Sequence, residues 1–292
     1  MDSGRKVNVV RFEHIEPFYE RVEPYLLPQE AEHNLTFGLL ETIRHDPTRF
    51  PQAIFVLVED ANEVQLVATQ TDAERALVLS LAASLGAVTE LARQLHEWGV
   101  VLPGATGPAE VSRAYVEAWA RMTDQSFHVI TPLRTFKLDK VNPVTGVPGV
   151  LRRAHEGDRD QLLAWELAFR REAFPEKQPN LREVERAVDF RLHSEISGSF
   201  LWDDGGAVCY VGFGGPTPHG IRIGPVYTPP EKRKCGYASA CVAGVSQWLL
   251  DNGRKFCFLF TDQRNPTSNH IYQEIGYEPV CDFTEYAFGT PE

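Results

Sequence analysis

Residues 226–239 have the sequence Val226-Tyr-Thr-Pro-Pro-Glu-Lys-Arg-Lys-Cys-Gly-Tyr-Ala-Ser239. The beginning is typical of a β-strand, the two prolines end that strand, and a short loop containing Gly236 leads into a predicted helix. The N-terminus of a helix offers unpaired backbone N–H groups and a partial positive charge, which suit a phosphate. Gly236 and Ala238 leave the backbone open to such a ligand. This stretch therefore predicts an anion-binding strand–loop–helix unit of an α/β protein.

The same stretch is also compatible with a purely structural turn. A strand, a glycine bend and a helix occur in α/β proteins that bind no phosphate. The loop matches neither the GxxxxGK[ST] pattern of the P-loop nor the GxGxxG pattern of dinucleotide-binding folds. On its own, the loop therefore does not decide between a binding site and a plain structural turn.

A second motif follows at residues 265–277, Asn265-Pro-Thr-Ser-Asn-His-Ile-Tyr272-Gln-Glu-Ile-Gly-Tyr277. Its Asn-rich start and its glycine near the end are typical of the two ends of a helix. Arg233-Lys-Cys-Gly-Tyr-Ala238 resembles the R/Q-x-x-G-x-G/A pyrophosphate loop of the GNAT superfamily of acyl-CoA N-acyltransferases, and residues 265–277 resemble its second coenzyme A motif. The resemblance covers about residues 148–290. It departs from the common pattern at Cys235 and at Ala238, where the loop still works through its backbone.

The resemblance implies that acetyl-CoA is the cosubstrate. The pantetheine arm would contact the backbone of Val226, Tyr227 and Thr228. The family's pyrophosphate contacts would fall on Arg233, Lys234, Cys235, Gly236, Tyr237, Ala238 and Ser239. Asn265 and Asn269 would contact the cofactor from the following helix, although Asn265 is equally suited to capping that helix.

Tyr272 is the candidate catalytic residue, at the position where the family has its acid. The CoA thiolate that leaves when an amine attacks the thioester needs a proton, and a phenol with an ordinary pKa of ~10 can supply one at neutral pH. A backbone N–H of Tyr227 or Val226 would meet the developing oxyanion. The alternative is that Tyr272 is a half-buried aromatic residue that packs its helix.

No general base is predicted. Most titratable side chains that could act as the base are expected to be solvated surface charges, and a water molecule can relay the proton instead. These side chains are Glu166, Glu172, Glu195, Asp203, Asp204 and His219. A nucleophilic role for Cys235 is disfavoured, because direct transfer needs no acyl-enzyme.

The Pro/Gly-rich stretch 141–149 divides the chain almost in half. After it we expect the order βααβββαβαβ, with strands at 149–154, 199–202, 207–213, 221–227, 255–261 and 279–288 and helices at 157–174, 181–193, 236–251 and 265–275. Before it the order is nearly the same, with helices at 30–45, 87–98 and 109–122 and strands at 53–58, 64–69, 76–81, 100–102 and 127–138. We therefore expect an α/β fold with mixed sheets and two tandem GNAT-like domains. The first, at 1–145, is expected to be degenerate, because it lacks the R/QxxGxG/A pattern, and to have lost CoA binding. The second, at 146–292, is expected to be an acetyltransferase domain.

The composition excludes several classes of protein. A net charge of −11 argues against a nucleic-acid partner. The longest mostly apolar stretch, 76–89, is too short to span a bilayer, and the N-terminus lacks the apolar segment of a secretory signal. The five cysteines form no CxxC pair, which argues against a metal site and for free thiols. We expect a cytoplasmic protein with no membrane partner.

Together these patterns predict an N-acetyltransferase that transfers an acetyl group from acetyl-CoA to a primary amine of a small molecule or peptide, directly in a ternary complex. The alternative is a CoA-binding sensor or scaffold without turnover, and the presence of Tyr272 favours the enzyme. The acceptor, the acyl-chain preference and the oligomeric state are not predicted.

Overall fold

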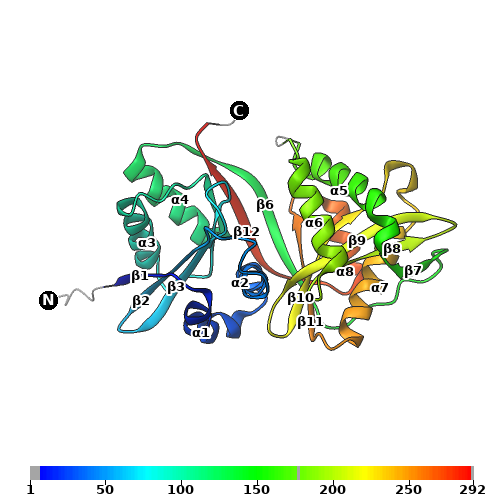
Figure 1. Ribbon diagram of the computed structural model, residues 1–292, viewed down its shortest axis with the longest axis horizontal. Helices are drawn as coiled ribbons and strands as arrows, with labels where there is room; N and C mark the ends of the chain where they lie inside the picture. The colour runs from blue at the N-terminus through cyan, green and yellow to red at the C-terminus, as the bar shows by residue number, and fades with distance from the viewer. Residues whose placement is uncertain (1–6, 176–177, 291–292) are drawn as a thin grey trace. The chain divides into compact units, whose positions relative to one another are not determined.

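The computed structural model describes residues 7–175 and 178–290 and has a mixed α/β fold (Figure 1). The chain forms two compact units. Within the described residues, the first unit comprises 7–135, 261–264 and 279–290, and the second comprises 136–175, 178–260 and 265–278. The domain division expected from the sequence, 1–145 and 146–292, stays a prediction.

The first unit has the order βααβββαβαβ. Its elements are β1 (Asn8–Phe12), α1 (Ile15–Leu26), the 3-10 turn η1 (Leu27–Gln29), α2 (Asn34–His45), β2 (Ile54–Asp60), β3 (Glu63–Gln70), β4 (Leu77–Leu79), α3 (Leu85–Glu97), β5 (Gly104–Pro108), α4 (Ala109–Thr123) and β6 (Phe127–Leu138), which leads into the second unit. The strand order is β1-β2-β3-β4-β5, followed by the C-terminal strand β12 (Glu278–Phe288) and β6. Neighbouring strands from β1 to β4 are antiparallel, whereas β4 and β5 are parallel.

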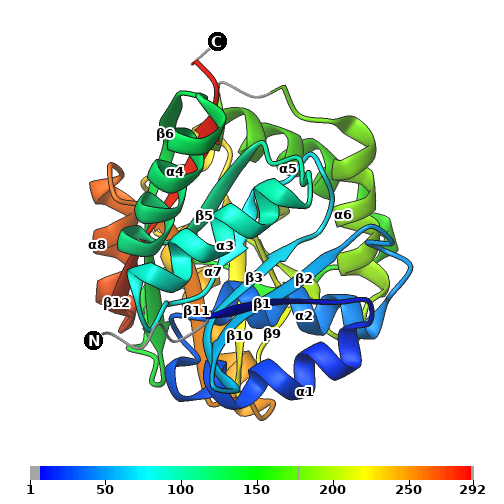
Figure 2. The ribbon, with the colours of Figure 1, turned by 90° about the vertical axis from the view of Figure 1, so that its left-hand side faces the viewer.

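Alternating side chains of this sheet form two apolar layers. Leu66 on β3 packs with α3 and α4, while the next residue, Val67, packs with α1 and α2. This follows from the period of two in a strand, which points successive side chains to opposite faces. The two helix pairs therefore cover opposite faces of the first sheet (Figure 2).

The second unit repeats this plan. Its elements are β7 (Val150–Arg153), the 3-10 turn η2 (Glu156–Asp158), α5 (Arg159–Ala173), α6 (Leu181–His193), β8 (Gly198–Asp203), β9 (Ala207–Pro216), β10 (Gly220–Tyr227), the 3-10 turn η3 (Pro230–Lys232), α7 (Tyr237–Asp251), β11 (Phe256–Asp262) and α8 (Pro266–Ile275) (Figure 1). Its strand order is β11-β10-β9-β8-β7. Val211 on β9 packs in the cluster that contains α7, and the preceding Tyr210 packs with α5 and α6 on the opposite face.

The last strand pairs with a strand of the first unit. β12 pairs antiparallel with β5, with Tyr286 opposite Ala105 and Ala287 opposite Gly104. Most of β12 therefore belongs to the first unit, although it follows the second unit in sequence. A Cβ atom on Gly104 would lie 2.0 Å from the Tyr286 carbonyl oxygen, so this close approach requires glycine.

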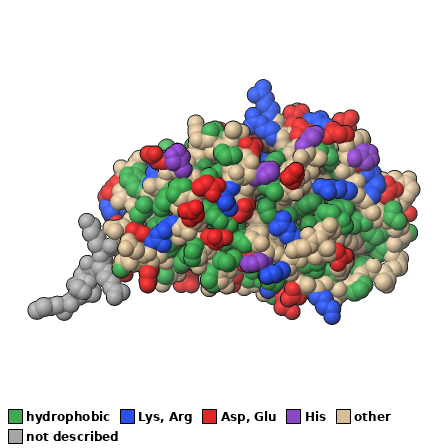
Figure 3. Space-filling model, turned by 60° about the horizontal axis from the view of Figure 1, so that its bottom comes forward, with side chains coloured by type: hydrophobic (Ala, Val, Ile, Leu, Met, Phe, Trp, Pro, Cys, Tyr) green, Lys and Arg blue, Asp and Glu red, His purple; other side chains and the backbone are tan. Residues whose placement is uncertain are grey.

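The surface carries charges of both signs. On the face shown in Figure 3, Lys and Arg side chains are interspersed with Asp and Glu. In the second unit, Arg159 pairs with Asp189 at 2.7 Å. Among the described residues, no helix combines the length and apolar character needed to cross a membrane.

A buried histidine gives the first unit a predictable acid sensitivity. The His33 ring is 1% exposed, its Nδ1 lies 2.8 Å from the Leu26 carbonyl oxygen, and the Leu81 N–H donates to its Nε2 over 3.2 Å. Burial lowers the pKa of His33 from 6.5 to about 4, although the bond to Leu26 opposes the shift. Between these pH values the unfolded chain binds a proton that the folded chain does not, so the free energy of unfolding rises with pH across this window.

We therefore expect His33 to lower the free energy of unfolding by about 3 kcal/mol between pH 7 and pH 4. Denaturant titrations of the wild type and of a His33→Gln variant, whose amide also offers one donor and one acceptor, would measure it. The variant should lose this part of the pH dependence. An identical slope in both proteins would show that His33 does not cause it.

Candidate active site

Two neighbouring strands of the second unit diverge. β10 and β11 are parallel and pair only from Gly220–Phe256 to Arg222–Phe258. Beyond this point β10 continues to Tyr227 through a cis Gly224–Pro225 bond and a register shift against β9. Beyond the pair Arg222–Phe258, the backbone N–H and C=O groups by which β10 and β11 face each other are not paired across the two strands, among the residues that the structure describes. These groups can therefore bind another molecule.

The residues expected to contact the pantetheine arm end β10. Val226 is half-buried on the side of α7, and Tyr227 is buried on the side of α5. Thr228 follows them, and its buried hydroxyl contacts the Cys209 thiol. These three residues lie beyond the last pair of β10 with β11, Arg222 with Phe258.

The loop that follows leads to an open helix N-terminus. Lys234 (φ 64°) and Gly236 (φ 81°) both have left-handed backbone conformations. Gly236 is the N-cap of α7 and has no side chain to accept the first N–H groups, and the first turn contains no acidic residue. Tyr237, Ala238 and Ser239, which form this turn, therefore present the donors and positive dipole end that suit a pyrophosphate.

The side chain of Arg233 already has protein partners. Its Nε donates to the Thr228 carbonyl oxygen over 2.9 Å, and its Nη2 donates to both carboxylate oxygens of Glu172 on α5 over 2.9 and 2.7 Å. With side-chain exposures of 42% and 48%, this ion pair contributes at most about 1 kcal/mol. The guanidinium thus fixes the shape of the loop and ties it to α5.

Two further loop residues have different surroundings. The Tyr237 hydroxyl donates to Asp204 over 2.6 Å, and this bond raises the pKa of Tyr237 to about 12. Asp204 therefore attaches the β8–β9 turn to the start of α7. Cys235 is exposed, and its Sγ lies 3.5 Å from the Arg233 carbonyl oxygen.

Asn265 caps α8, which is one of the two roles predicted for it, the other being contact with the cofactor. Its side-chain oxygen accepts the Ser268 N–H over 3.1 Å, and the Asn269 side chain donates to the Asn265 carbonyl over 2.9 Å. The helix ends at Gly276, which has φ 110°. Contacts of the two asparagines with a cofactor stay a prediction.

Tyr272 is half-buried on α8 and makes an edge contact with the Tyr277 ring at 6.1 Å. Its hydroxyl has no hydrogen-bond partner among the described residues. Burial raises the pKa of Tyr272 to about 12, and the nearby Cys209 thiol adds to the shift. The phenol is therefore protonated at neutral pH and can donate to a ligand.

One carboxylate differs from the expectation of solvated surface charges. Glu166 on α5 is 2% exposed and accepts hydrogen bonds from Arg170, Arg191 and Tyr210. A carboxylate can be buried in this way because three donors compensate its lost hydration. Glu172, Glu195 and Asp204 are exposed as expected.

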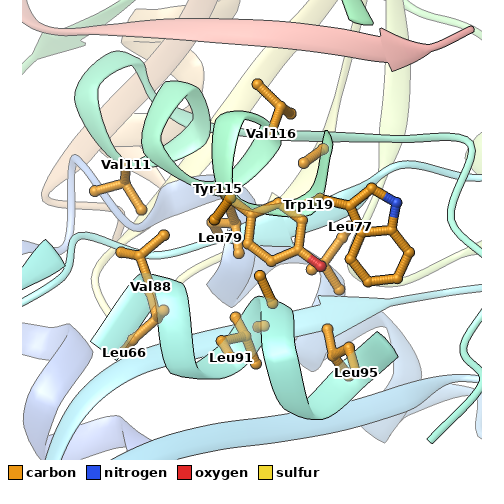
Figure 4. Close-up of a cluster of buried hydrophobic side chains, with 14 of the residues drawn as sticks. Leu66, Leu77, Leu79, Val88, Leu91, Leu95, Val111, Tyr115, Val116 and Trp119 are labelled. Carbon is orange, nitrogen blue, oxygen red and sulfur yellow. The ribbon is translucent and has the colours of Figure 1, made fainter. Parts of the chain in front are cut away.

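The first unit has no equivalent loop. Residues 80–84 alone separate β4 from α3, and the Ser84 side chain caps that helix by accepting the Ala87 N–H over 3.3 Å. Tyr115 is the seventh residue of α4, as Tyr272 is of α8. Its side chain lies among Leu79, Leu91 and other apolar residues (Figure 4), and its buried hydroxyl has no partner within the described chain.

Comparison with known proteins identifies the class. Residues 159–277 match the model of the acetyltransferase (GNAT) family. These residues therefore match an acetyltransferase domain of the GNAT type, a family whose members transfer an acyl group from acyl-CoA. A comparison with curated proteins gave no match.

Solved structures show the same fold along nearly the whole chain. A Drosophila protein has a TM-score of 0.67 at 12% identity, with 99% of each chain covered. A GCN5-related N-acetyltransferase from Sphaerobacter thermophilus has a TM-score of 0.62 at 14% identity, covering 97% of this chain and 98% of its own. A tandem GNAT protein from the clavulanic acid biosynthesis pathway has a TM-score of 0.58 at 12% identity, covering 98% and 100%. These likenesses confirm the tandem GNAT fold.

Proposed function

We propose that the second unit transfers an acetyl group from acetyl-CoA directly to a primary amine of a small molecule or peptide. The observation that carries the proposal is the divergence of β10 from β11 beside a helix N-terminus without a side-chain cap. The backbone of Val226, Tyr227 and Thr228 would bind the pantetheine arm. The segment from Arg233 to Ser239 would bind the pyrophosphate through its N–H groups. Asn265 and Asn269 would bind from α8.

Acetyl-CoA would supply the acyl group as a thioester. Tyr272 would donate its phenolic proton to the departing sulfur, and its raised pKa keeps that proton available at neutral pH. A backbone N–H at Val226 or Tyr227 would stabilise negative charge on the acyl oxygen. Glu166 is a poor general base, because its three hydrogen-bond donors favour the ionised carboxylate. We assign no base, and water can carry the amine proton.

The test is to incubate the protein with acetyl-CoA and a panel of amines, amino acids and short peptides. Free CoA and acetylated amine should appear in equal amounts and only when both substrates are present. Chromatography should follow both products, because the exposed thiol of Cys235 would react with a thiol reagent. Tight CoA binding with no acetylated product from any amine would contradict the proposal and favour a CoA-binding sensor.

A further inference from the structure

The buried carboxylate Glu166 organises a cluster of charges on the face of the second sheet that α5 and α6 cover. Arg170 Nε and Arg191 Nη1 each donate to it over 2.9 Å, and the Tyr210 hydroxyl donates to the oxygen that Arg191 contacts. Burial alone would raise the pKa of Glu166, but Arg191, Tyr210 and Arg170 together hold it below its ordinary value. Glu166 is thus a fixed negative charge that orients two guanidinium groups.

Arg191 uses only one corner of its guanidinium in this cluster. Its Nη1 contacts Glu166, whereas its Nε and Nη2 have no hydrogen-bond partner among the described residues. The Nε–Nη2 edge is one that can bind a carboxylate with two parallel hydrogen bonds. Arg159 on α5 illustrates the difference, because its Nε and Nη2 already donate to Asp189.

This edge lies beside the segment of β10 that precedes the proposed reaction centre. A Cβ atom on Gly212 would lie 3.1 Å from Arg191 Nε and 2.9 Å from the Gly224 carbonyl oxygen. The absence of a side chain at Gly212 therefore lets the guanidinium approach the strands closely. Gly224 and Pro225 directly precede Val226, which pairs with Val211.

The side chain of Arg191 is 16% exposed, so part of it can reach a ligand although most of it is desolvated. A charge-assisted hydrogen bond at a partly desolvated site is stronger than one in water. Glu166 contacts Arg191 through Nη1 and so leaves the second edge unsatisfied. A guanidinium held in this way is suited to an anionic group of a bound molecule.

We infer that Arg191 binds an acidic group of the acceptor, so that the acceptor is an amine that carries a carboxylate near its amino group, as an amino acid does. This inference rests on the proposed function and names its substrate class. Arg191 selects the acceptor by its free Nε–Nη2 edge, and Glu166, Arg170 and Tyr210 position it. A phosphonate or sulfonate offers related chemistry, so aminoethylphosphonate and taurine belong in the same test.

The experiment compares kcat/KM for amino acids with kcat/KM for the matching amino-acid amides, which lack the carboxylate charge. The wild type should prefer the acids by about ten- to hundredfold, the range for loss of a charged hydrogen bond. An Arg191→Met, Glu166→Gln double variant removes the guanidinium without leaving a buried unpaired charge. It should lose the preference and retain its CoA affinity.

An Arg159→Met variant is the matched control, since it removes an arginine of the same helix pair whose Nε–Nη2 edge is already occupied. It should keep the preference. Calorimetric binding of the acids and amides to the CoA complex provides a second readout that needs no turnover. Acylation without a preference for acids, or an unchanged preference in the double variant, would overturn the inference alone. If acids bound in a way that depends on Arg191 but no acylation occurred, the inference would be supported and the proposed function contradicted. If neither acylation nor such binding occurred, both would be overturned.

Discussion

Replacement of Tyr272 by phenylalanine is expected to lower turnover by about 10²–10⁴, the range usual for loss of a general acid. The substitution keeps the ring and its contact with Tyr277 but removes the dissociable proton. Because the Tyr272 hydroxyl has no hydrogen bond to other described residues, its loss should leave thermal stability close to that of the wild type. CoA affinity should also change little.

The matched control is Tyr277→Phe. The Tyr277 hydroxyl is buried and lies 2.9 Å from Ser246 Oγ, so its removal breaks an internal hydrogen bond. We expect a loss of about 1 kcal/mol in the free energy of unfolding with turnover nearly unchanged. Stopped-flow or steady-state kinetics, thermal melts and CoA calorimetry on both variants would separate the two roles.

The raised pKa of Tyr272 adds a pH criterion. With a pKa of about 12, the phenol keeps its proton at every pH from 6 to 10, so turnover should show no alkaline decrease caused by this residue. If Tyr272→Phe turned over at the wild-type rate, Tyr272 would be a packing residue and another proton source would be required. If CoA binding disappeared as well, the tyrosine would be structural, and the choice between enzyme and sensor would reopen.

The ends of α7 and α8 could be predicted because their signals are local. Gly236 and Gly276 have left-handed backbone conformations that other residues adopt at a cost, and Asn265 caps a helix through its own side chain. Each requirement involves residues within a few positions in sequence. These are the motifs on which the family resemblance was based.

The prediction of a strand at 100–102 was wrong for a physical reason. Val100 and Val101 have high strand propensity, yet Val101 is 72% exposed and the strand β5 begins at Gly104. Gly104 approaches β12 closely, and a Cβ atom on Gly107 would lie 2.9 Å from the Leu79 carbonyl oxygen. Close neighbours from distant parts of the chain thus select glycine there, against its intrinsic preference.

The strand β1 and the helix α1 were not predicted, because their sequence signal is weaker. Phe18, Val22 and Leu26 occur at helical spacing and are buried on α1, but Pro24 interrupts the same segment. The pairing of β12 with β5 had no local signal, because both strands look the same from sequence whichever partner they take. Long-range pairing of this kind depends on the three-dimensional fit of the sheet.

The pairing of Glu166 with Arg191 was missed for a related reason. Glu166 lies at helical spacing with the apolar Leu162 and Trp165, but a charged residue is usually exposed. Its partners Arg191 and Tyr210 are distant in sequence and come together only in the folded unit. Burial of a charge becomes predictable only once its compensating donors are known.

Replacement of Gly236 by valine is expected to weaken CoA binding by tenfold or more, roughly 1.4 kcal/mol. Gly236 has φ 81°, and its added Cβ atom would lie 2.9 Å from Val147 Cγ2, so the N-cap of α7 would have to move. A left-handed conformation costs an L-residue about 1–2 kcal/mol, most for a β-branched one. The displaced N–H groups of Tyr237 and Ala238 would then no longer converge on a pyrophosphate.

Gly253→Val separates cofactor binding from backbone strain. Gly253 follows the other end of α7 with φ 94°, and nothing lies within 4 Å of its added Cβ atom. Both variants should lose stability in thermal melts through the same backbone strain, but calorimetry should find weaker CoA binding only for Gly236→Val. Unchanged affinity in a folded Gly236→Val protein would remove the loop from the site. Equal losses in both variants would mean that strain transmitted through α7, and not the geometry of its N-terminus, controls binding.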